Sequence, residues 1–338
     1  MTTSLPATAP AIGFYQGLPI SDPASLSDIT VDVVAPEGHD LLVEVEAVSV
    51  NPVDLKVRGA APASSEPKVI GFDAAGVVVA VGPQVSNFSV GDPVWYAGSV
   101  ARPGSNARYQ LVNSNVVGRR PRSLTAAQAA AMPLTTITAW EGLFDHLGLT
   151  AESSGVLLVI GAAGGVGSMV IQLAKQLTGL TVIAVASRED SAAWVSQLGA
   201  DQVVGRDFGD VIAGNGIDYV YSSFTPPNLD GIAKVIKPRG HIVCIDTSVP
   251  GIDALKPKSV TWHWEYMFTR PVSLPDDDYQ HRLLTEVADL VDAGRLRSTL
   301  TRTLSPLDAA TLRQAHEMVE SSTMIGKVVV TGWSQGAS

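Results

Sequence analysis

One stretch decides the fold, LLVIGAAGGVGSMVIQLA at residues 157–174. An apolar run enters a glycine-rich turn at Gly161, and an amphipathic helical pattern follows the last glycine, Gly167. Such a turn lets a pyrophosphate approach backbone N–H groups at the positive end of a helix, where side chains would block it. Because a strand and a helix flank the glycines, the stretch predicts a dinucleotide site rather than a tight turn without a ligand. The expected contacts are Ala162, Ala163, Gly164, Gly165, Val166 and Gly167.

The end of the next strand bears on which dinucleotide binds. A site for NAD usually has Asp or Glu there, which binds the adenosine ribose 2′-OH. This chain has Ser187 and Arg188 instead. A hydroxyl followed by a guanidinium suits a 2′-phosphate, through a hydrogen bond and a charge-assisted contact. The pair therefore favours NADPH, with the alternative that Arg188 is a solvated loop residue balanced by Glu189 and Asp190.

The pattern of the whole chain indicates an α/β protein of two domains. After about residue 125, apolar strand candidates at 156–160, 182–186, 202–204, 219–221 and 242–245 are mostly separated by helical patterns. This alternation predicts a doubly wound parallel sheet. Before it, short strands broken by Gly, Pro and Asp predict a bent barrel, with no helix of useful length before Leu124.

Two helices and a final strand are also expected. A hydroxyl-capped, alanine-rich helix should begin at Ser123 and stop at Pro133, and an amphipathic helix should cover 280–293 and end at Gly294. A strand at 327–330 could rejoin the N-terminal β region. The expected domains are residues 1–132 together with 272–338, and residues 133–271.

Composition narrows the class of protein. The chain has 338 residues, 46% of them apolar, a single cysteine and a formal charge of −10. One cysteine cannot form an intramolecular disulfide, which fits a reduced compartment, and the negative charge argues against a nucleic-acid partner. Signal and transit peptides require Lys or Arg, and the first 55 residues contain neither. No apolar run is long enough to span a bilayer. We therefore expect a soluble, cytoplasmic protein without a membrane partner.

Motifs beyond the glycine-rich turn resemble those of one family. Residues 51–59, NPVDLKVRG, resemble an NPxDxxxRxG segment; residues 71–78, with 81–82 and 90–94, resemble a GxDxAGxVxxVG…GDxV block; and residues 162–167 match AxGGVG. The chain thus resembles the medium-chain dehydrogenase/reductase superfamily in its quinone oxidoreductase branch. Residues 263–270, 280–282 and 325–327 are similar to a subgroup often labelled zinc-type alcohol dehydrogenase-like. The resemblance implies a GroES-like catalytic domain at 1–132 with 272–338, a Rossmann NADP(H)-binding domain at 133–271, and a nicotinamide that enters between them.

The zinc in that label is not supported by the residues. Zinc-dependent members hold the catalytic metal with Cys, His and Glu, where this chain has Asn51, Phe72 and Asp73. Amide and phenyl groups cannot complete a zinc shell. The four-cysteine structural lobe is also missing. The sequence therefore predicts no metal site.

The resemblance also implies roles for individual residues. Asn51 and Thr138 should lie near the nicotinamide, with Asp54 either catalytic or a structural cap. The remaining expected cofactor contacts are Ser223, Phe224 and Thr225, after a strand end, and Lys327. The expected acceptor pocket is Phe72, Trp264, Met267 and Phe268, with ordinary core packing as the alternative.

Without a Lewis acid, alcohol oxidation loses its means of stabilising an alkoxide, whereas reduction of an activated acceptor does not need one. We therefore expect NADPH-dependent hydride transfer to a quinone or an α,β-unsaturated carbonyl compound (an enone), by a homodimer as in many relatives. A non-catalytic NADPH-binding protein, as some crystallins of this family are, and a zinc-dependent alcohol dehydrogenase remain alternatives.

Overall fold

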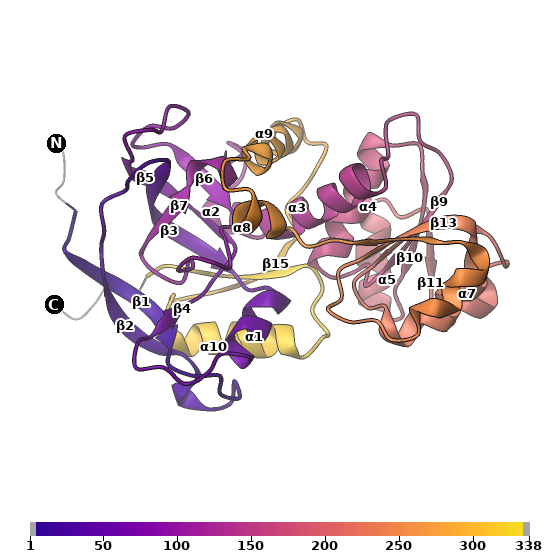
Figure 1. The fold of residues 1–338 in the computed structure, drawn as a ribbon, viewed down its shortest axis with the longest axis horizontal. Helices are drawn as coiled ribbons and strands as arrows, with labels where there is room; N and C mark the ends of the chain where they lie inside the picture. The colour runs from indigo at the N-terminus through magenta and orange to yellow at the C-terminus, as the bar shows by residue number, and fades with distance from the viewer. Residues whose placement is uncertain (1–4, 334–338) are drawn as a thin grey trace. The chain divides into compact units, whose positions relative to one another are not determined.

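A six-stranded parallel sheet forms around the glycine-rich stretch in the computed structural model, which describes residues 5–333 (Figure 1). Its strand order is β11-β10-β9-β12-β13-β14. The strands are β9 (Val156–Ile160), β10 (Thr181–Val185), β11 (Gln202–Val204), β12 (Ile217–Ser222), β13 (Ile236–Cys244) and β14 (Thr261–Trp264). All five predicted strands are confirmed, and every pairing between neighbours is parallel.

Helices connect these strands and bury the sheet. The segments are α4 (Gly165–Leu177), α5 (Glu189–Gln197), α6 (Phe208–Val211), α7 (Leu229–Val235) and the 3₁₀ turns η4 (Pro226–Asn228) and η5 (Ile252–Lys258). Before the sheet, α3 (Pro133–Trp140) continues into a π-helix, η3 (Glu141–His146). Leu158, Val220 and Ile242 pack in one core with Ile232 and Val235 of α7. The continuous apolar runs noted in the sequence are therefore strands that are buried on both faces.

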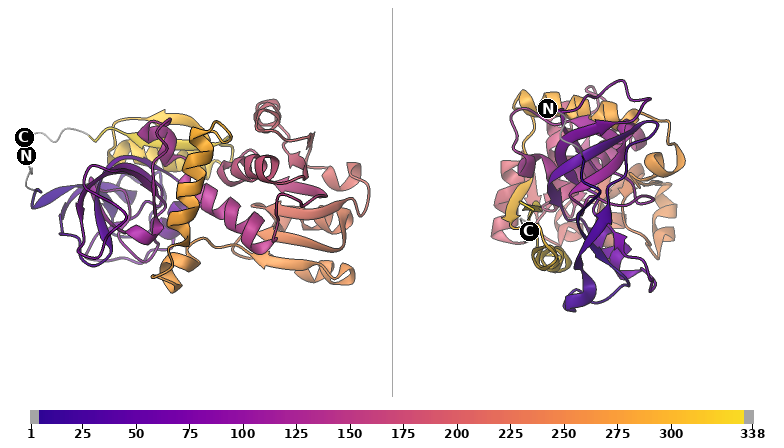
Figure 2. Two further views of the ribbon diagram at one scale, coloured as in Figure 1. Left: turned by 90° about the horizontal axis from the view of Figure 1, so that it is seen from above. Right: turned by 90° about the vertical axis from the view of Figure 1, so that its left-hand side faces the viewer.

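The β region contains two sheets. The larger has the order β15-β16-β3-β5-β6-β8, with β7 paired to β3, and the smaller has the order β2-β1-β4. Their strands are β1 (Thr8–Phe14), β2 (Ser27–Asp32), β3 (Asp40–Ser49), β4 (Lys68–Val69), β5 (Ala74–Val81), β6 (Pro93–Tyr96), β7 (Tyr109–Asn113), β8 (Val117–Arg119), β15 (Leu300–Leu304) and β16 (Lys327–Thr331). β16 pairs antiparallel with β3, so the C-terminal strand does rejoin the N-terminal region, as Figure 2 shows in its left view.

The helices of this region correct two expectations. They are α1 (Pro52–Gly59), α2 (Ala126–Ala130), α8 (Thr269–Ser273), α9 (Tyr279–Asp292) and α10 (Ala309–Glu320), with 3₁₀ turns η1 (Pro23–Ser25) and η2 (Ser114–Val116). The expectation of no helix before Leu124 was wrong, because α1 has eight residues and Pro52 at its first position. α2 begins at Ala126 and not at Ser123, and its hydroxyl cap is Thr125, which forms a capping box with Gln128. The helix expected at 280–293 is confirmed as α9.

The chain divides into two units. One, here called the inserted unit, is Thr135–Met267 and contains the parallel sheet. The other, here called the split unit, combines Met1–Leu134 with Phe268–Ser338 and contains both other sheets. Within the described range, 5–333, the structure contains no helix with the length and apolar character needed to cross a membrane.

Candidate functional site

The glycine-rich turn of the inserted unit has the backbone geometry of a phosphate site. β9 ends at Ile160, Gly161 has φ +77°, and α4 begins at Gly165 with Gly164 as its N-cap. No side chain caps this helix, and residues 163–166 are partly exposed. Backbone N–H groups at the start of a 13-residue helix are thus open to an anion.

Gly167 and Gly164 are needed in this turn for different steric reasons. A Cβ on Gly167 would lie 2.5 Å from the Gly161 carbonyl oxygen and 2.6 Å from the Ala162 Cα, so this glycine allows α4 to pack against β9. A Cβ on Gly164 would meet its nearest atom only at 3.4 Å. Gly164 therefore leaves space above the turn, where a pyrophosphate would approach.

Four further residues that the sequence predicts as cofactor contacts lie just after the ends of the neighbouring strands β10 and β12. Ser187 and Arg188 are exposed, and Arg188 is the N-cap of α5, where its backbone N–H donates to the Ser191 Oγ at 3.2 Å. Ser223 lies against the turn, since its Oγ donates to the Ile160 carbonyl at 3.2 Å, and Phe224 is exposed.

Thr225 faces the protein interior instead. Its hydroxyl donates to the Ser222 Oγ at 2.7 Å and lies 3.4 Å from the Cys244 Sγ, while its backbone N–H donates to Asp246. The expected cofactor contact by its side chain is therefore not supported by this placement. A strand-end position alone does not reveal which of three consecutive side chains points outward.

Four polar residues of the split unit form what we call the buried charge cluster: Asn51, Asp54, Asp73 and Lys327. The Lys327 Nζ donates to the Val50 carbonyl at 2.9 Å, to the Asn51 Oδ1, and to the Asp73 Oδ2 at 3.2 Å. The Asn51 Nδ2 donates to the same Asp73 oxygen at 2.8 Å. The cluster thus joins the start of α1, the residue before β5 and the first residue of β16.

Asp54 and Asp73 also complete two helix starts. The Asp54 Oδ2 accepts from the Asn51 backbone N–H at 2.8 Å at the start of α1, and the Asp73 Oδ1 accepts from the Leu134 N–H at 2.8 Å in the first turn of α3. These carboxylates satisfy N–H groups that the helices leave unpaired. Asp54 therefore acts as a structural cap of α1 through its Oδ2, which was one of its two expected roles. Its other oxygen, Oδ1, is buried without a hydrogen-bond partner.

Burial shifts the protonation of this cluster. It raises the pKa of Asp54 to about 7, against the lowering effect of the Asn51 N–H and the Lys327 charge. Burial also raises the pKa of Asp73, which Lys327 and Asn51 partly oppose, and it lowers the pKa of Lys327. The ion pair of Lys327 with Asp73 leaves Asp54 as the carboxyl group that binds a proton near neutral pH.

The cluster places Asn51 and Lys327 differently from what the sequence led us to expect. Asn51 was expected to present its amide to the nicotinamide or acceptor, but both ends of that amide bond inside the cluster and the residue is 1% exposed. Lys327 was expected to reach the cofactor, but its ammonium is buried against Asn51 and Asp73.

The same contacts bear on zinc. The ammonium of Lys327 binds the oxygens of Asn51 and Asp73, which are two of the three positions where relatives hold the metal, and Phe72 at the third has no donor atom. These residues do not fit a zinc ion. Between residues 5 and 333, no group of three or more His, Cys, Asp or Glu has an arrangement that could hold a metal.

The expected pocket residues are only partly brought together. Phe72 and Phe268 are both buried and pack edge to face, with ring centroids 5.3 Å apart. Met267 is buried, whereas Trp264 is 49% exposed at the end of β14 and packs on Trp262. Thr138 lies on α3, nearly buried, and its carbonyl accepts from the Tyr221 hydroxyl at 2.7 Å.

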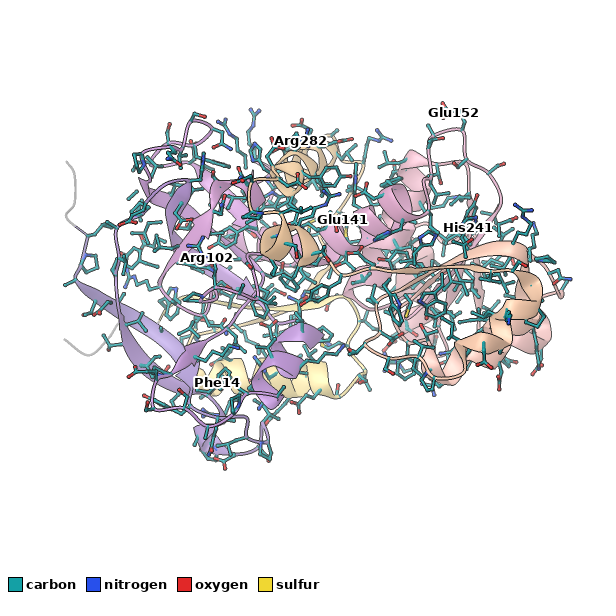
Figure 3. All side chains as sticks on the ribbon, in the orientation of Figure 1. Phe14, Arg102, Glu141, Glu152, His241 and Arg282 are labelled. Atoms are coloured by element: carbon teal, nitrogen blue, oxygen red, sulfur yellow. The ribbon has the colours of Figure 1, made fainter. Side chains whose placement is uncertain are left out.

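Sequence reasoning missed a titratable cluster in the inserted unit. The His146 Nε2 lies 2.8 Å from the Glu265 Oε2, and the rings of His146, His263 and His241 follow one another at 5.8 Å spacing. Glu265 also contacts Glu141, and its pKa is raised by burial and lowered by His146. Glu141 and His241 are labelled in Figure 3. Glu141 and His146 share one π-helix, and His263 and Glu265 are two residues apart, but the contact of His146 with Glu265 joins residues 119 positions apart and has no local signal.

Comparison with known proteins agrees with this fold. Family models match an alcohol dehydrogenase GroES-like domain at residues 37–139 and a zinc-binding dehydrogenase at residues 198–330. A zinc-type alcohol dehydrogenase-like protein of Staphylococcus epidermidis is 41% identical over 333 residues, covering 95% of this chain and 98% of that protein.

Solved structures match over almost the whole chain. A Rhizobium etli CFN 42 protein that is assigned by name to the zinc-dependent alcohol dehydrogenases is 48% identical, with a TM-score of 0.91 over 97% of this chain and 99% of that one. The quinone oxidoreductase of Coxiella burnetii is 27% identical, with a TM-score of 0.81 over 96% and 99%. With its GroES-like and Rossmann folds, this chain belongs to the medium-chain dehydrogenase/reductase superfamily of oxidoreductases, in the quinone oxidoreductase-like branch.

Proposed function

We propose that this protein is a metal-independent, NADPH-dependent reductase of quinones or enones. The observation that carries the proposal is the ammonium of Lys327 bonded to Asn51 and Asp73, at positions where zinc-dependent relatives place their ligands. A protein cation at these oxygens leaves no donor set for a Lewis acid. Conjugated carbonyl acceptors suit such a site because their reduction does not require a metal-stabilised alkoxide.

The dinucleotide would be held by the inserted unit. Residues 162–167 present backbone N–H groups to the pyrophosphate, Ser223 and Phe224 border the turn, and Ser187 with Arg188 bind the 2′-phosphate. NADPH supplies the hydride when it is bound. Thr138 is proposed to orient the nicotinamide through its hydroxyl.

The buried charge cluster would act by positioning and by holding a proton. Lys327 and Asp73 fix the side-chain amide of Asn51, the residue that precedes α1. With a pKa raised by burial to about 7, Asp54 exchanges a proton near neutral pH, and its unpartnered Oδ1 is the atom on which that proton would sit. Phe72 and Phe268 are buried and pack edge to face, so their contact with an acceptor, which the sequence predicts, would require one of the rings to become accessible.

Anaerobic mixing with NADPH and a panel of quinones, enones, aldehydes and alcohols tests the proposal. We expect oxidation of NADPH, followed at 340 nm, with a quinone or an enone. Tight binding of NADPH without turnover by any acceptor would instead support a non-catalytic NADPH-binding protein. Metal analysis of protein purified without an affinity tag completes the test, because stoichiometric zinc whose removal abolishes activity would overturn metal independence.

The choice of NADPH over NADH depends on Arg188. Replacing it, Arg188→Ala, should weaken NADPH binding about tenfold or more, since a hydrogen bond to a charged group contributes about 1.5–3 kcal/mol. Affinity for NADH should stay the same. Equal losses for both dinucleotides would show that Arg188 does not contact the 2′-phosphate.

We also propose a cytoplasmic homodimer. β14 is an edge strand of the parallel sheet, and Trp264 and Tyr266 at its end are about half exposed. Exposed edge strands with large apolar side chains favour pairing with a second chain. Sedimentation velocity should give the mass of a dimer, and a charged replacement, Trp264→Lys, should shift it toward the monomer.

A further inference from the structure

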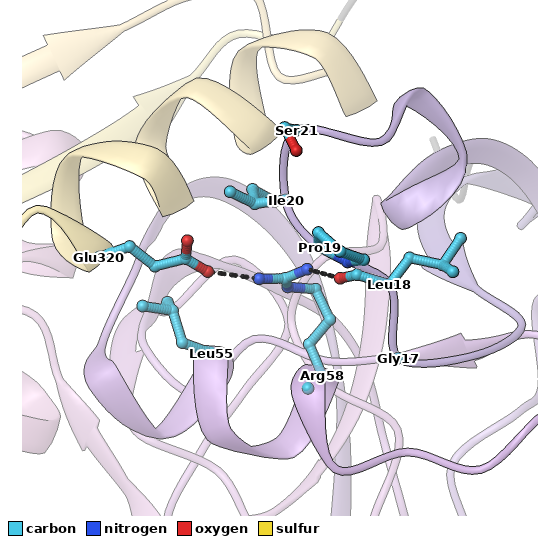
Figure 4. Close-up of a pocket in the computed structure, with 9 residues that line it drawn as sticks. Gly17, Leu18, Pro19, Ile20, Ser21, Leu55, Arg58 and Glu320 are labelled. Atoms are coloured by element: carbon cyan, nitrogen blue, oxygen red, sulfur yellow. Dashed lines mark hydrogen bonds and ion pairs between the residues drawn. The ribbon is translucent and has the colours of Figure 1, made fainter.

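A cavity lies in the split unit, lined by residues outside the buried charge cluster (Figure 4). It has a volume of about 460 Å³, within the range of small-molecule sites. One side is apolar, formed by Leu18, Pro19, Ile20 and Leu55, and the floor is polar, formed by Arg58 with Glu320. Arg58 belongs to the NPxDxxxRxG-like segment, and the proposed function gives it no role.

Arg58 is a buried cation with few partners. Its side chain is 3% exposed; one terminal nitrogen donates to the Leu18 carbonyl at 2.5 Å and the other to the Glu320 Oε1 at 2.5 Å. Its Nε is buried without a hydrogen-bond partner. A buried guanidinium requires an anion, and its planar fork matches a carboxylate.

The carboxylate that pairs with Arg58, that of Glu320, lies at the edge of the cavity. Glu320 is the last residue of α10, and its side chain is 39% exposed. A carboxylate at a helix C-terminus is disfavoured by the helix dipole, and an exposed side chain moves away at low cost. Glu320 is therefore an exchangeable partner of Arg58.

Neighbouring His316 does not supply a negative charge to Arg58 in place of Glu320. His316 on α10 is fully buried with neither ring nitrogen partnered, and burial together with the Arg58 charge lowers its pKa to about 3. It is therefore neutral at physiological pH. Glu320 is the sole charged group that acts on the pKa of Arg58 in the described part of the chain.

The walls of the cavity are fixed by backbone. Gly17 packs against the end of α1, where a Cβ would lie 2.6 Å from the Gly59 carbonyl oxygen and 2.8 Å from that of Arg58. The Gly17 N–H also donates to the Ala61 carbonyl at 2.9 Å. The segment 17–20 is thereby held beside α1, so the cavity exists before a ligand binds.

We propose that this cavity binds a small aliphatic monocarboxylate, whose carboxylate replaces Glu320 on Arg58 and whose chain lies against Leu18, Ile20 and Leu55. The carboxylate satisfies the buried guanidinium, and the chain covers the apolar wall. The site is separate from the dinucleotide turn and does not depend on the proposed reductase activity.

Chemical rescue of Glu320→Ala tests the proposal. This variant leaves Arg58 without an anion, so its melting temperature should fall. Sodium hexanoate should then raise the melting temperature by several degrees more than sodium chloride at equal ionic strength, and formate should raise it less than hexanoate. Calorimetry should show at least tenfold tighter binding of hexanoate to Glu320→Ala than to the unmodified protein, which must first release Glu320.

Matched controls separate the site from general effects. Glu317→Ala removes the same charge from an exposed position on the same helix and should bind hexanoate like the unmodified protein. Leu55→Asp, combined with Glu320→Ala, should abolish the rescue by hexanoate, because it places a like charge in the path of the chain. The uncharged hexanamide should not rescue.

Three results would overturn the proposal. They are no rescue of Glu320→Ala beyond that of chloride, the same gain in affinity in Glu317→Ala, and equal rescue by formate and hexanoate. The last would mean that the apolar wall takes no part in binding. None of these readouts requires NADPH turnover, so a failed reductase assay leaves this test unaffected.

Discussion

Lys327 shows how one buried side chain joins segments of the split unit that are far apart in sequence. Its ammonium donates to three oxygens, which belong to Val50 and Asn51 between β3 and α1 and to Asp73 just before β5. Two of these oxygens come from Asn51 and Asp73, which would otherwise be buried acceptors in need of a cation. The cluster is therefore sensitive to the charge of each member.

Removing the cation should destabilise the protein strongly. In Lys327→Met the carboxylate of Asp73 stays buried without its counter-ion, and breaking such a pair costs about 3–5 kcal/mol. Urea unfolding of the variant measures this loss. The double variant Lys327→Met with Asp73→Asn should regain much of it, because neither charge is left unpaired; equal stability of the single and double variants would contradict the pairing.

Asp54 should make stability depend on pH. Its folded pKa of about 7 lies above the ordinary value of 3.8, so the folded state binds the proton more tightly. The contribution of Asp54 is thus most favourable below about pH 4 and is lost as the pH rises to about 7, at roughly 1.4 kcal/mol per unit. Asp54→Asn, which cannot lose that proton, should therefore gain stability relative to the unmodified protein between pH 5 and pH 7. Parallel curves of stability against pH would show that the group does not titrate in this range.

At the scale of elements, the turn between β9 and α4 was predictable because its signal is local. Strand, glycines and helix are contiguous in sequence, and the close packing that requires Gly167 comes from backbone atoms of the same turn. α1 was missed because a short helix with Pro52, Lys56 and Arg58 lacks an apolar stripe, although Asn51 and Asp54 formed a capping pattern. Contacts across 276 residues, such as that of Lys327 with Asn51, have no local signal.

Two glycine variants separate packing from ligand approach. Gly167→Ala should lower stability, because the added Cβ would lie within 2.6 Å of backbone atoms of the preceding turn. Gly164→Ala should leave the melting temperature nearly unchanged and weaken NADPH binding, because its Cβ would occupy the open space above the turn. Thermal unfolding with and without NADPH measures both effects. Unchanged NADPH binding in Gly164→Ala would argue against the pyrophosphate position.

At the scale of the whole molecule, the split unit depends on strands from both ends of the chain. β16 lies between β15 and β3 in the larger sheet. The sequence predicted this strand from its apolar run, but only pairing with β3 makes it an interior strand. The inserted unit, by contrast, is continuous in sequence and has its own core.

A proline in β16 should therefore unfold the split unit and leave the inserted unit folded. Val329→Pro removes a backbone N–H from a buried strand that has neighbours on both sides, and should unfold much of the split unit. Hydrogen–deuterium exchange should show lost protection in β3 and β5, with protection retained in β9 and β12. Val90→Pro, in an exposed turn, is the matched control and should leave both units protected. Loss of protection in all strands alike would mean that the two units unfold as one.

The place of β16 has a consequence for biosynthesis. β3 leaves the ribosome early, yet the partner of Ser49 in β16 follows it by 279 residues. The inserted unit is complete once Met267 has been made, whereas the larger sheet waits for about 60 more residues, or roughly 3–12 s of translation. During this interval the N-terminal strands are nascent chain with unpaired edges. Their first 55 residues carry eight carboxylates and no basic side chain. Because like charges repel, we expect this acidity to oppose aggregation of the unfinished sheet on a polysome.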